Sequence, residues 1–462
     1  MKALNANLPQ DPALPQLATV LNTSQMAPVF ADLLAGSGTT LLRCHVDRVK
    51  YRAQRNLSVA YLLDLQDAQG PFTQRVAARL CTGGDSARRH AKAAARPLQA
   101  SRAGPALSHV PALDLSAHWW PNDAKLAAGA VLSDVHALQQ RWLPEVAAAL
   151  RVGPCTGHGL EVVQLVPEHR VTARVDLHLA HGSKALDHTV YAKADAETRG
   201  PVTQAVMESL WQSPARRDGR LALPRPLLWQ AASGLQWQAA VAGCALLDAR
   251  PTPDATCAAA VGRLLAALHQ SPAPAAPWVT LDGLRQQLRD TQALLCAVQP
   301  ALASRTGCVA AQLEAGLSHI GNGAQTLSTL HGDLHPRNLM LDGEDLSLID
   351  LDSARQGPAL LDLGAWLADA IYRAQLAGRR DVGIEVGRSA FLSGYVHGGG
   401  QHFGTRPMAW ATAWQLWCLR VWRCIVNLKP GRFALVPGLL AQTEALLAHR
   451  EVPKLEPQEW AI

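Results

Sequence analysis

Three polar side chains occur at a spacing that suits phosphoryl transfer, in the segment His331-Gly-Asp-Leu-His-Pro-Arg-Asn338 and the run that follows it. Asp333 is followed by Asn338 five residues later, and Asp350 comes twelve residues after that. In phosphoryl transfer an Asp accepts the proton of the attacking hydroxyl, while an Asn and a second Asp hold Mg²⁺. The spacing therefore predicts Asp333 as a catalytic base and Asn338 and Asp350 as metal ligands.

A hairpin is predicted to bring Asn338 and Asp350 together. Residues 339–341 and 346–349 are short apolar strands, and the turn between them contains Gly343, which can adopt positive φ. Pro336 disfavours helix in the loop that precedes the hairpin. The alternative is an ordinary surface hairpin, but two carboxylates gathered without a metal would repel each other.

Composition narrows the class of protein. The chain has 462 residues, 48% hydrophobic and 17% charged, enough for two or three globular domains. We expect no signal peptide and no membrane span, since no run of roughly eighteen apolar residues exists, and hence a cytoplasmic location.

Nine scattered Cys without a C-x-x-C pair predict neither a zinc site nor a disulfide framework. The net charge of +6 comes from dispersed Arg, which indicates a solvated surface or attraction for an anionic nucleotide rather than nucleic-acid binding.

The pattern along the chain predicts three parts. Residues 1–150 are expected to form an α+β module and residues 151–243 a β-rich lobe. Residues 244–462 are expected to form a helical lobe that carries the catalytic loop 331–338 and the metal-binding strand 346–352. The oligomeric state is not predicted.

The first two parts share a similar order of predicted strands and turns. Residues 54–65 and 169–179 have similar patterns, and each is followed by a turn and another strand. A helix is expected over 198–211. One interpretation is a duplicated unit of roughly 115 residues, and the other is two similar hairpins that arose by chance.

The catalytic segment, with Ile349-Asp-Leu-Asp352 and Asp362-Leu-Gly364, resembles the aminoglycoside phosphotransferase and choline kinase superfamily. This resemblance implies a bilobal protein-kinase-like α+β fold that uses ATP and Mg²⁺ to phosphorylate small molecules. It also implies that Asp352 supports the metal site and that His331 and Asp362 brace the catalytic loop. Residues 1–150 resemble the cap module of maltokinase-like relatives, although no specific motif marks them.

In the β-rich lobe, Val190-Tyr-Ala-Lys193 resembles the strand of this superfamily whose Lys binds the nucleotide phosphates. Glu208 on the following helix is the candidate ion-pair partner of Lys193, and solvated side chains are the alternative for both residues. The Gly-rich phosphate loop of protein kinases is missing, because the turn Pro167-Glu-His-Arg170 contains no Gly. A hinge between the lobes is expected near residues 238–243.

His335 and Arg337 lie inside the catalytic loop and are candidates for contacts with substrate or phosphate. The leading hypothesis is a kinase that transfers the γ-phosphate of ATP to a hydroxyl of a sugar, amino alcohol or aminoglycoside-like acceptor. The alternative is a catalytically weak, nucleotide-binding pseudokinase that acts as a scaffold or regulator. The missing Gly-rich loop favours the alternative, and the intact Asp333, Asn338 and Asp350 oppose it. Neither hypothesis identifies the acceptor.

Overall fold

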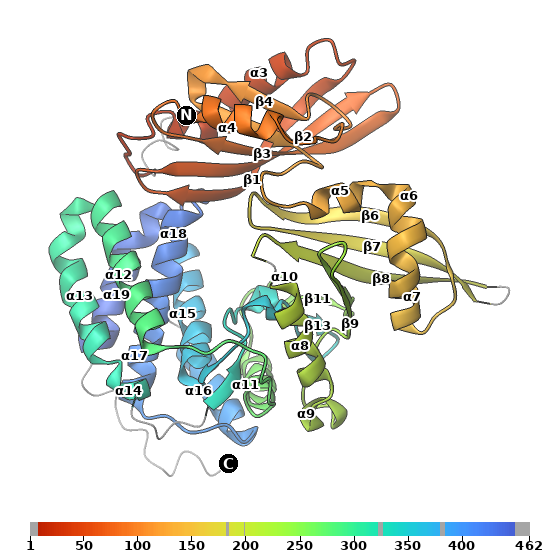
Figure 1. Cartoon of the computed structure of the whole chain (residues 1–462). Coiled ribbons are helices and arrows are strands. Elements are labelled where there is room, and N and C mark those ends of the chain that lie inside the picture. The colour runs from red at the N-terminus through yellow and green to blue at the C-terminus, as the bar shows by residue number, and fades with distance from the viewer. Residues whose placement is uncertain (1–7, 182–183, 198, 322–326, 379–383, 449–462) are drawn as a thin grey trace. The chain divides into compact units, whose positions relative to one another are not determined.

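The computed structural model describes residues 8–181, 184–197, 199–321, 327–378 and 384–448, and Figure 1 shows the course of the chain. It consists of two compact units. The first contains Met1–Gln204, Arg225–Ala240 and Val426–Pro430, and the second contains Ala205–Pro224, Val241–Ile425 and Gly431–Ile462. The division after Ala240 falls inside the segment where the sequence predicts a hinge.

The first unit begins with a five-stranded antiparallel sheet of order β1-β2-β3-β5-β4. Its strands are β1 (Thr40–Arg52), β2 (Asn56–Asp67), β3 (Gly70–Leu80), β4 (Leu107–Val110) and β5 (Leu115–Trp119). Helices α2 (Leu17–Leu21) and α3 (Thr23–Leu33) precede the sheet, and α4 (Asp85–Ala94) follows β3. Phe30 of α3 packs edge-on against Tyr61 and Trp119, so α3 buries the aromatic face of this sheet.

A second five-stranded sheet has the order β6-β7-β8-β10-β9. Its strands are β6 (Cys155–Val166), β7 (Arg170–His181), β8 (Lys184–Asp195), β9 (Pro226–Gln230) and β10 (Leu235–Ala239). The helical segments α5 (Ala128–Ser133), α6 (Val135–Ala137) and α7 (Leu143–Leu150), with a π-helical turn at Leu138–Trp142, contribute to a core that includes Val171, Val175 and Trp237. Helix α8 (Gly200–Trp211) follows β8; the predicted start at Thr198 lies outside the described residues.

The two sheets have the same topology. In each, three strands form a meander, a helix follows the third strand, and two further strands join beside the third in reversed order. In each, helices before the first strand cover one face. The duplicated unit stays a prediction, and the shared order of five strands is the topology that such a duplication requires.

The second unit is mainly helical, as predicted for the C-terminal part. Its long helices are α11 (Ala255–His269), α12 (Leu281–Val298), α13 (Ala303–Ala315), α15 (Leu360–Leu376), α16 (Ile384–His397), α17 (Thr405–Gln415) and α19 (Val436–Ala448). Helices α11 and α16 approach closely because both carry glycine at the contact: a Cβ on Gly394 would lie 2.1 Å from the Ala259 carbonyl oxygen. A Trp-rich stretch covers residues 408–426, and its Trp410, Trp414 and Trp417 are buried in the core of this unit.

Short elements complete this unit. They are α9 (Pro214–Arg217), α10 (Leu246–Ala249), α14 (Ser318–Gly321), α18 (Trp422–Val426), β11 (Cys244–Ala245), β12 (Leu327–Leu330), β13 (Leu339–Asp342), β14 (Asp345–Leu348) and β15 (Arg355–Pro358). The unit also takes in residues 205–224, which the sequence assigns to the N-lobe. The backbone explains this difference, since the N–H of Leu348 donates to the carbonyl oxygen of Ala222 at 2.9 Å.

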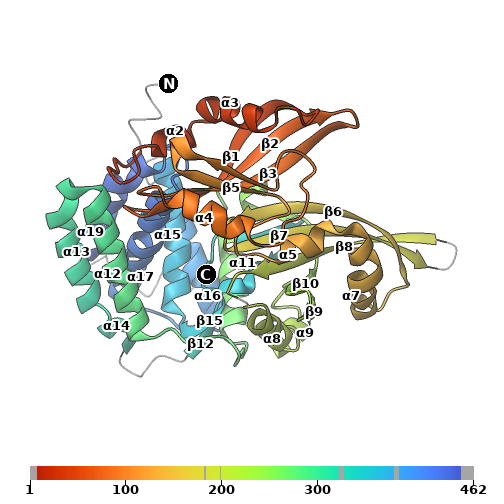
Figure 2. The same ribbon diagram turned by 45° about the horizontal axis from the view of Figure 1, so that its top comes forward.

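Figure 2 shows the same arrangement from a second direction. The nine cysteines are all free thiols in this structure. No helix within the described ranges is long and apolar enough to cross a membrane.

Candidate active site

The catalytic loop is braced by one buried carboxylate. Asp362, in the first turn of α15, accepts the backbone N–H of His331 at 2.6 Å through Oδ2 and that of Gly332 at 3.0 Å through Oδ1. Gly332 adopts φ +77°, and a Cβ there would lie 2.1 Å from the Ser353 carbonyl oxygen. The loop therefore needs glycine at residue 332, for its left-handed backbone and for the close approach.

Two histidines extend this brace. His269, the last residue of α11, lies 3.3 Å from Asp362 through Nε2, and its Nδ1 lies 2.9 Å from the Tyr395 hydroxyl. His331 Nε2 donates to the carbonyl oxygen of Ile349, and its Nδ1 accepts the N–H of Asp333. Burial raises the pKa of Asp362, but the hydrogen bond and charge of His269 lower it further, so the carboxyl pKa is below its usual range. Both histidines are structural in this geometry.

Asp333 presents its two carboxylate oxygens to different surroundings. Oδ2 accepts a hydrogen bond from the Arg423 guanidinium at 2.8 Å. Oδ1 is buried and has no hydrogen-bond partner within the described part of the chain. Burial raises the pKa of Asp333, yet the charge and hydrogen bond of Arg423 outweigh it, so this pKa also falls below the usual range. The carboxylate is therefore ionised near neutral pH, and one of its oxygens can still accept a hydrogen bond.

The two loop side chains proposed for substrate contact differ in placement. His335 Nε2 lies 3.8 Å from Oδ1 of Asp333, and burial is the main cause that lowers the His335 pKa to about 4. Its ring is thus neutral at physiological pH. Arg337 is exposed, with its guanidinium 3.9 Å from the Asp248 carboxylate. His335 faces the catalytic carboxylate, whereas Arg337 lies on the surface.

The predicted hairpin is present. β13 and β14 pair with Asp342 opposite Asp345, and Gly343 in the turn has φ +60°. The N–H of Ile349 donates to the Asn338 carbonyl oxygen at 3.0 Å, so Asp350 directly follows the residue paired with Asn338. Asn338 donates its Nδ2–H to the Asp333 carbonyl oxygen at 2.9 Å, which leaves its side-chain oxygen for another partner.

Asp350 has a left-handed backbone, φ +62° and ψ +54°, and begins the short 3-10 turn that contains Asp352. The described residues hold no group of three or more His, Cys, Asp or Glu side chains gathered as a metal site. The predicted ligands are instead one amide and two carboxylates. Such hard oxygen donors, few in number, suit Mg²⁺ that also binds phosphates and water.

Lys193 is half-buried on β8, where it pairs with Thr172 of β7 and Gln236 of β10. Sequence reasoning missed a neighbour of this site, Gln204 on α8, whose Oε1 accepts the Gln236 side-chain N–H at 3.1 Å. Glu208 lies one helical turn beyond Gln204 and is exposed. The Lys193–Glu208 ion pair stays a prediction.

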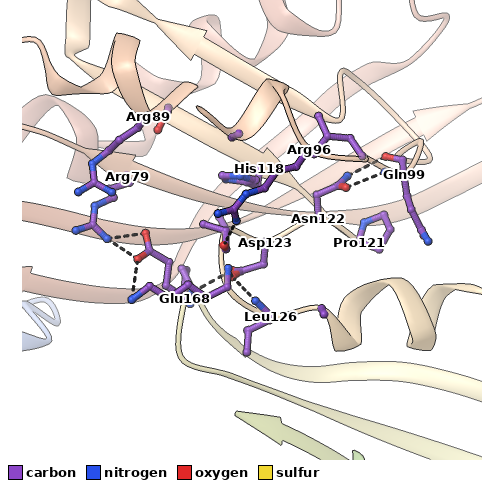
Figure 3. Close-up of a pocket in the computed structure, with 18 of the residues that line it drawn as sticks. Arg79, Arg89, Arg96, Gln99, His118, Pro121, Asn122, Asp123, Leu126 and Glu168 are labelled. Carbon is purple, nitrogen blue, oxygen red and sulfur yellow. Dashed lines mark hydrogen bonds and ion pairs between the residues drawn. The ribbon is translucent and has the colours of Figure 1, made fainter. Parts of the chain in front are cut away.

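The glycine-free turn between β6 and β7 is held by side chains from residues 1–150. Arg79 Nη1 lies 2.5 and 2.6 Å from the two carboxylate oxygens of Glu168, and the Lys125 ammonium lies 3.8 Å from one of them. Asp123 accepts the backbone N–H of Glu168 at 3.0 Å. Figure 3 shows Arg79 and Asp123 on either side of Glu168. Ion pairs thus fix a turn that glycines shape in protein kinases.

Arg420 and Arg423, two functional candidates that the sequence analysis missed, come from the Trp-rich stretch. Arg420 lies in a π-helical turn at Leu416–Val421 and is buried, with its guanidinium 3.1 Å from the Asp369 carboxylate. Arg423 follows three residues later and reaches Asp333. The sequence offers one signal for these residues, namely two Arg spaced by three residues in an otherwise apolar helix. Because an unpaired buried charge is costly, such arginines are expected to have acidic partners.

A model of the phosphotransferase enzyme family matches residues 194–411. No curated protein matches the chain. Similar solved structures include a choline/ethanolamine kinase family protein from Mesorhizobium loti, with 15% identity over 70% of this chain and 94% of that chain and a TM-score of 0.44. Spectinomycin phosphotransferase, in complex with ADP and spectinomycin, has 9% identity over 64% and 94%, with a TM-score of 0.43. The choline kinase LicA from Streptococcus pneumoniae has 11% identity over 66% and 96%, with a TM-score of 0.43. At these TM-scores the structural likenesses carry no functional argument.

The family match covers the braced loop and the hairpin, and it gives the class of the protein as a phosphotransferase with an α+β fold. Residues 194–411 match the model of the phosphotransferase enzyme family, a little under half of the chain. The resemblance found in the sequence and the enzyme class predicted from it are thereby confirmed. The roles of individual site residues, the division at residues 150 and 243, and the maltokinase-like cap remain predictions.

Proposed function

We propose that the protein is a kinase that transfers the γ-phosphate of ATP to a hydroxyl group of a small acceptor. Asp333 is the catalytic base, and Asn338 and Asp350 are the Mg²⁺ ligands, with Asp352 in support. Lys193, with Glu208 as its partner, binds the nucleotide phosphates. The sugar, amino alcohol and aminoglycoside-like classes of acceptor all suit this chemistry.

The observation that carries the proposal is the asymmetry of the Asp333 carboxylate. Arg423 holds Oδ2 at 2.8 Å, while Oδ1 is buried without a partner among the described residues. A buried, ionised oxygen without a hydrogen bond is costly unless a ligand supplies one. A substrate hydroxyl donating to Oδ1 would satisfy it and would be oriented for attack.

The residues around Asp333 suit this role. Its lowered pKa keeps it ionised, so it orients the hydroxyl first and takes the proton as the bond to phosphorus forms. Neutral His335, 3.8 Å from Oδ1, adds no charge that would compete for the carboxylate. Bound Mg²⁺ would neutralise the developing charge on the phosphate oxygens. Asn338 and the carboxylates of Asp350 and Asp352 are the residues that would hold it.

The Asp333→Asn variant tests the proposal. Because the amide cannot accept the proton, turnover should fall by about 10²–10⁴-fold, the usual contribution of a general base. Nucleotide affinity should change little. The assay is Mg·ATP-dependent phosphate transfer to a panel of hydroxyl compounds, with nucleotide binding followed by calorimetry.

Asp282→Asn, at an exposed site on α12, is the matched control. Native-like turnover in Asp333→Asn would remove Asp333 from the mechanism. Nucleotide binding by the native chain without transfer to any acceptor would instead favour the pseudokinase.

A further inference from the structure

A cavity of about 500 Å³ lies in the first unit (Figure 3), and none of the residues assigned to catalysis lines it. Its walls come from β3, α4, the loop after α4, the segment before α5 and the turn at Pro167 and Glu168. The volume is within the range of small-molecule sites, roughly 300–1,000 Å³. Alanine, proline and leucine side chains supply an apolar surface, and charged side chains reach into it.

The charges around the cavity are predominantly positive. Five basic residues line it, namely Arg79, Arg89, Lys92, Arg96 and Lys125, against the two carboxylates of Asp123 and Glu168. Both carboxylates are already engaged. Glu168 is bound by Arg79, and Asp123 accepts three backbone N–H groups, from Lys125, Leu126 and Glu168, at 2.8, 3.1 and 3.0 Å.

Two of the basic side chains have no carboxylate partner among the described residues. They are Lys92 and Arg96, near the C-terminal end of α4. Arg96 donates to the carbonyl oxygen of Ala124 at 3.2 Å, and Figure 3 shows it reaching toward His118 and Asp123. Arg89, by contrast, is paired with Asp85 at 2.7 Å. The cavity thus combines an apolar surface with positive charge that the protein leaves uncompensated.

The repeated topology gives a second reason to expect an anion here, through the proposed phosphate role of Lys193. Trp119 of β5 pairs with Val76, and Trp237 of β10 pairs with Ala192; both tryptophans are buried and donate their indole N–H to a side chain. The two sheets can be aligned by placing these tryptophans at equivalent positions. The residue that follows the partner of the tryptophan on the third strand is then Ala77 in the first sheet and Lys193 in the second.

The match extends to the fifth strand and the helix. His118 corresponds to Gln236, and α4 corresponds to α8. Ala77, His118 and α4 all line the cavity. The cavity therefore lies on the face of the first sheet that corresponds to the Lys193 face of the second. Ala77 leaves space where the second sheet has Lys193, and the cations come instead from α4 (Lys92) and from the loop that follows it (Arg96).

We propose that this cavity binds a small organic phosphate monoester, with Lys92 and Arg96 as its phosphate ligands. A phosphate dianion carries more charge than a carboxylate and can pair with several separate cations at once. Guanidinium groups also bind phosphate through directed N–H donors. The correspondence with Lys193 rests on the proposed function, whereas the charge and apolar surface of the cavity do not.

Calorimetry on the full chain without nucleotide tests this proposal, with phenyl phosphate, inorganic phosphate and benzoate as probes. Phenyl phosphate should bind more tightly than inorganic phosphate, because its ring adds apolar contact, and more tightly than benzoate. The Lys92→Gln/Arg96→Gln double variant should weaken phenyl phosphate at least tenfold. Phenyl phosphate should also shift the NMR signals of the His118 ring.

Arg88→Gln is the matched control, since Arg88 lies on the same helix, is exposed and does not line the cavity. Arg88→Gln and Asp333→Asn should both bind phenyl phosphate as the native chain does. Absence of binding at millimolar concentration, equal affinity in the double variant, or equal affinity for benzoate would overturn the proposal. A kinase assay without turnover would leave these results unchanged, so the two proposals fail separately.

Discussion

Arg423 decides the charge state of the proposed base. Burial and the Arg423 guanidinium act on Asp333 in opposite directions, and the guanidinium prevails. The catalytic segment itself gives no hint of this contact, since Arg423 lies 90 residues further along the chain. At the scale of single residues, the reactivity of the loop therefore depends on a side chain outside the motif.

Removing Arg423 should move the pH dependence of the enzyme. In Arg423→Gln the burial of Asp333 is no longer offset, so its pKa rises and a larger fraction of the base is protonated at mildly acidic pH. The acid limb of the kcat/KM profile should shift to higher pH. Arg423→Lys retains the charge and should restore much of the native profile.

Arg305→Gln, which breaks an exposed ion pair with Glu444 in the same unit, is the control for this profile. An acid limb that stays in place in Arg423→Gln would show that Arg423 does not set the pKa of the base.

At the scale of elements, Asp362 joins α15, the catalytic loop and α11. Two backbone N–H groups and the His269 ring converge on this one buried carboxylate. Asn supplies only one acceptor oxygen and no charge, so at least one donor would be left unsatisfied.

Asp362→Asn should therefore lower the free energy of unfolding by about 3 kcal/mol, near the lower end for a broken buried pair. Urea unfolding followed by tryptophan fluorescence measures this, because Trp366 on α15 and the tryptophans of α17 are buried. The exposed Asp282→Asn variant should unfold as the native chain does. Native stability in Asp362→Asn would show that the brace contributes little.

Much of the local site could be predicted because its parts lie within twenty residues. The hairpin, the turn at Gly343 and the side-by-side placement of Asn338 and Asp350 all follow from short-range patterns. The bond between His269 and Asp362 spans 93 residues, and that between Arg79 and Glu168 spans 89. The sequence around either residue of such a pair does not indicate its partner, so these contacts can be seen only in the folded chain.

At the scale of the whole molecule, side chains of the N-terminal part hold the turn between β6 and β7. The Arg79–Glu168 pair is largely buried, with side-chain exposures of 15% and 13%. Burial raises the pKa of Glu168, but the charge of Arg79 lowers it further, so the carboxyl pKa in the folded chain is below its usual range. The stabilisation by this pair is complete above the ordinary Glu pKa of about 4.3 and is lost as the pH falls through the lowered pKa.

Glu168→Gln should consequently be less thermostable than the native chain at pH 7, by a few degrees if the loss is about 1 kcal/mol. The deficit should narrow as the pH falls from 7 through the lowered Glu168 pKa, because the native carboxylate then becomes protonated as well. Differential scanning calorimetry over this pH range checks the trend. Glu161→Gln, at an exposed position on β6, should show no deficit across the same range. A Glu168→Gln deficit that is independent of pH would contradict the assignment.

The left-handed backbone of Asp350 has an evolutionary consequence. Asp, Asn and Gly are the residues that adopt this conformation most readily. Asn and Gly are each one nucleotide change away from an Asp codon, and both keep the loop in shape while removing the carboxylate. A duplicated gene for this protein could therefore lose the proposed metal ligand Asp350 in one step and still encode a stable fold. Such paralogues, with Asn or Gly at the position that follows Ile349, would be recognisable from their sequences alone.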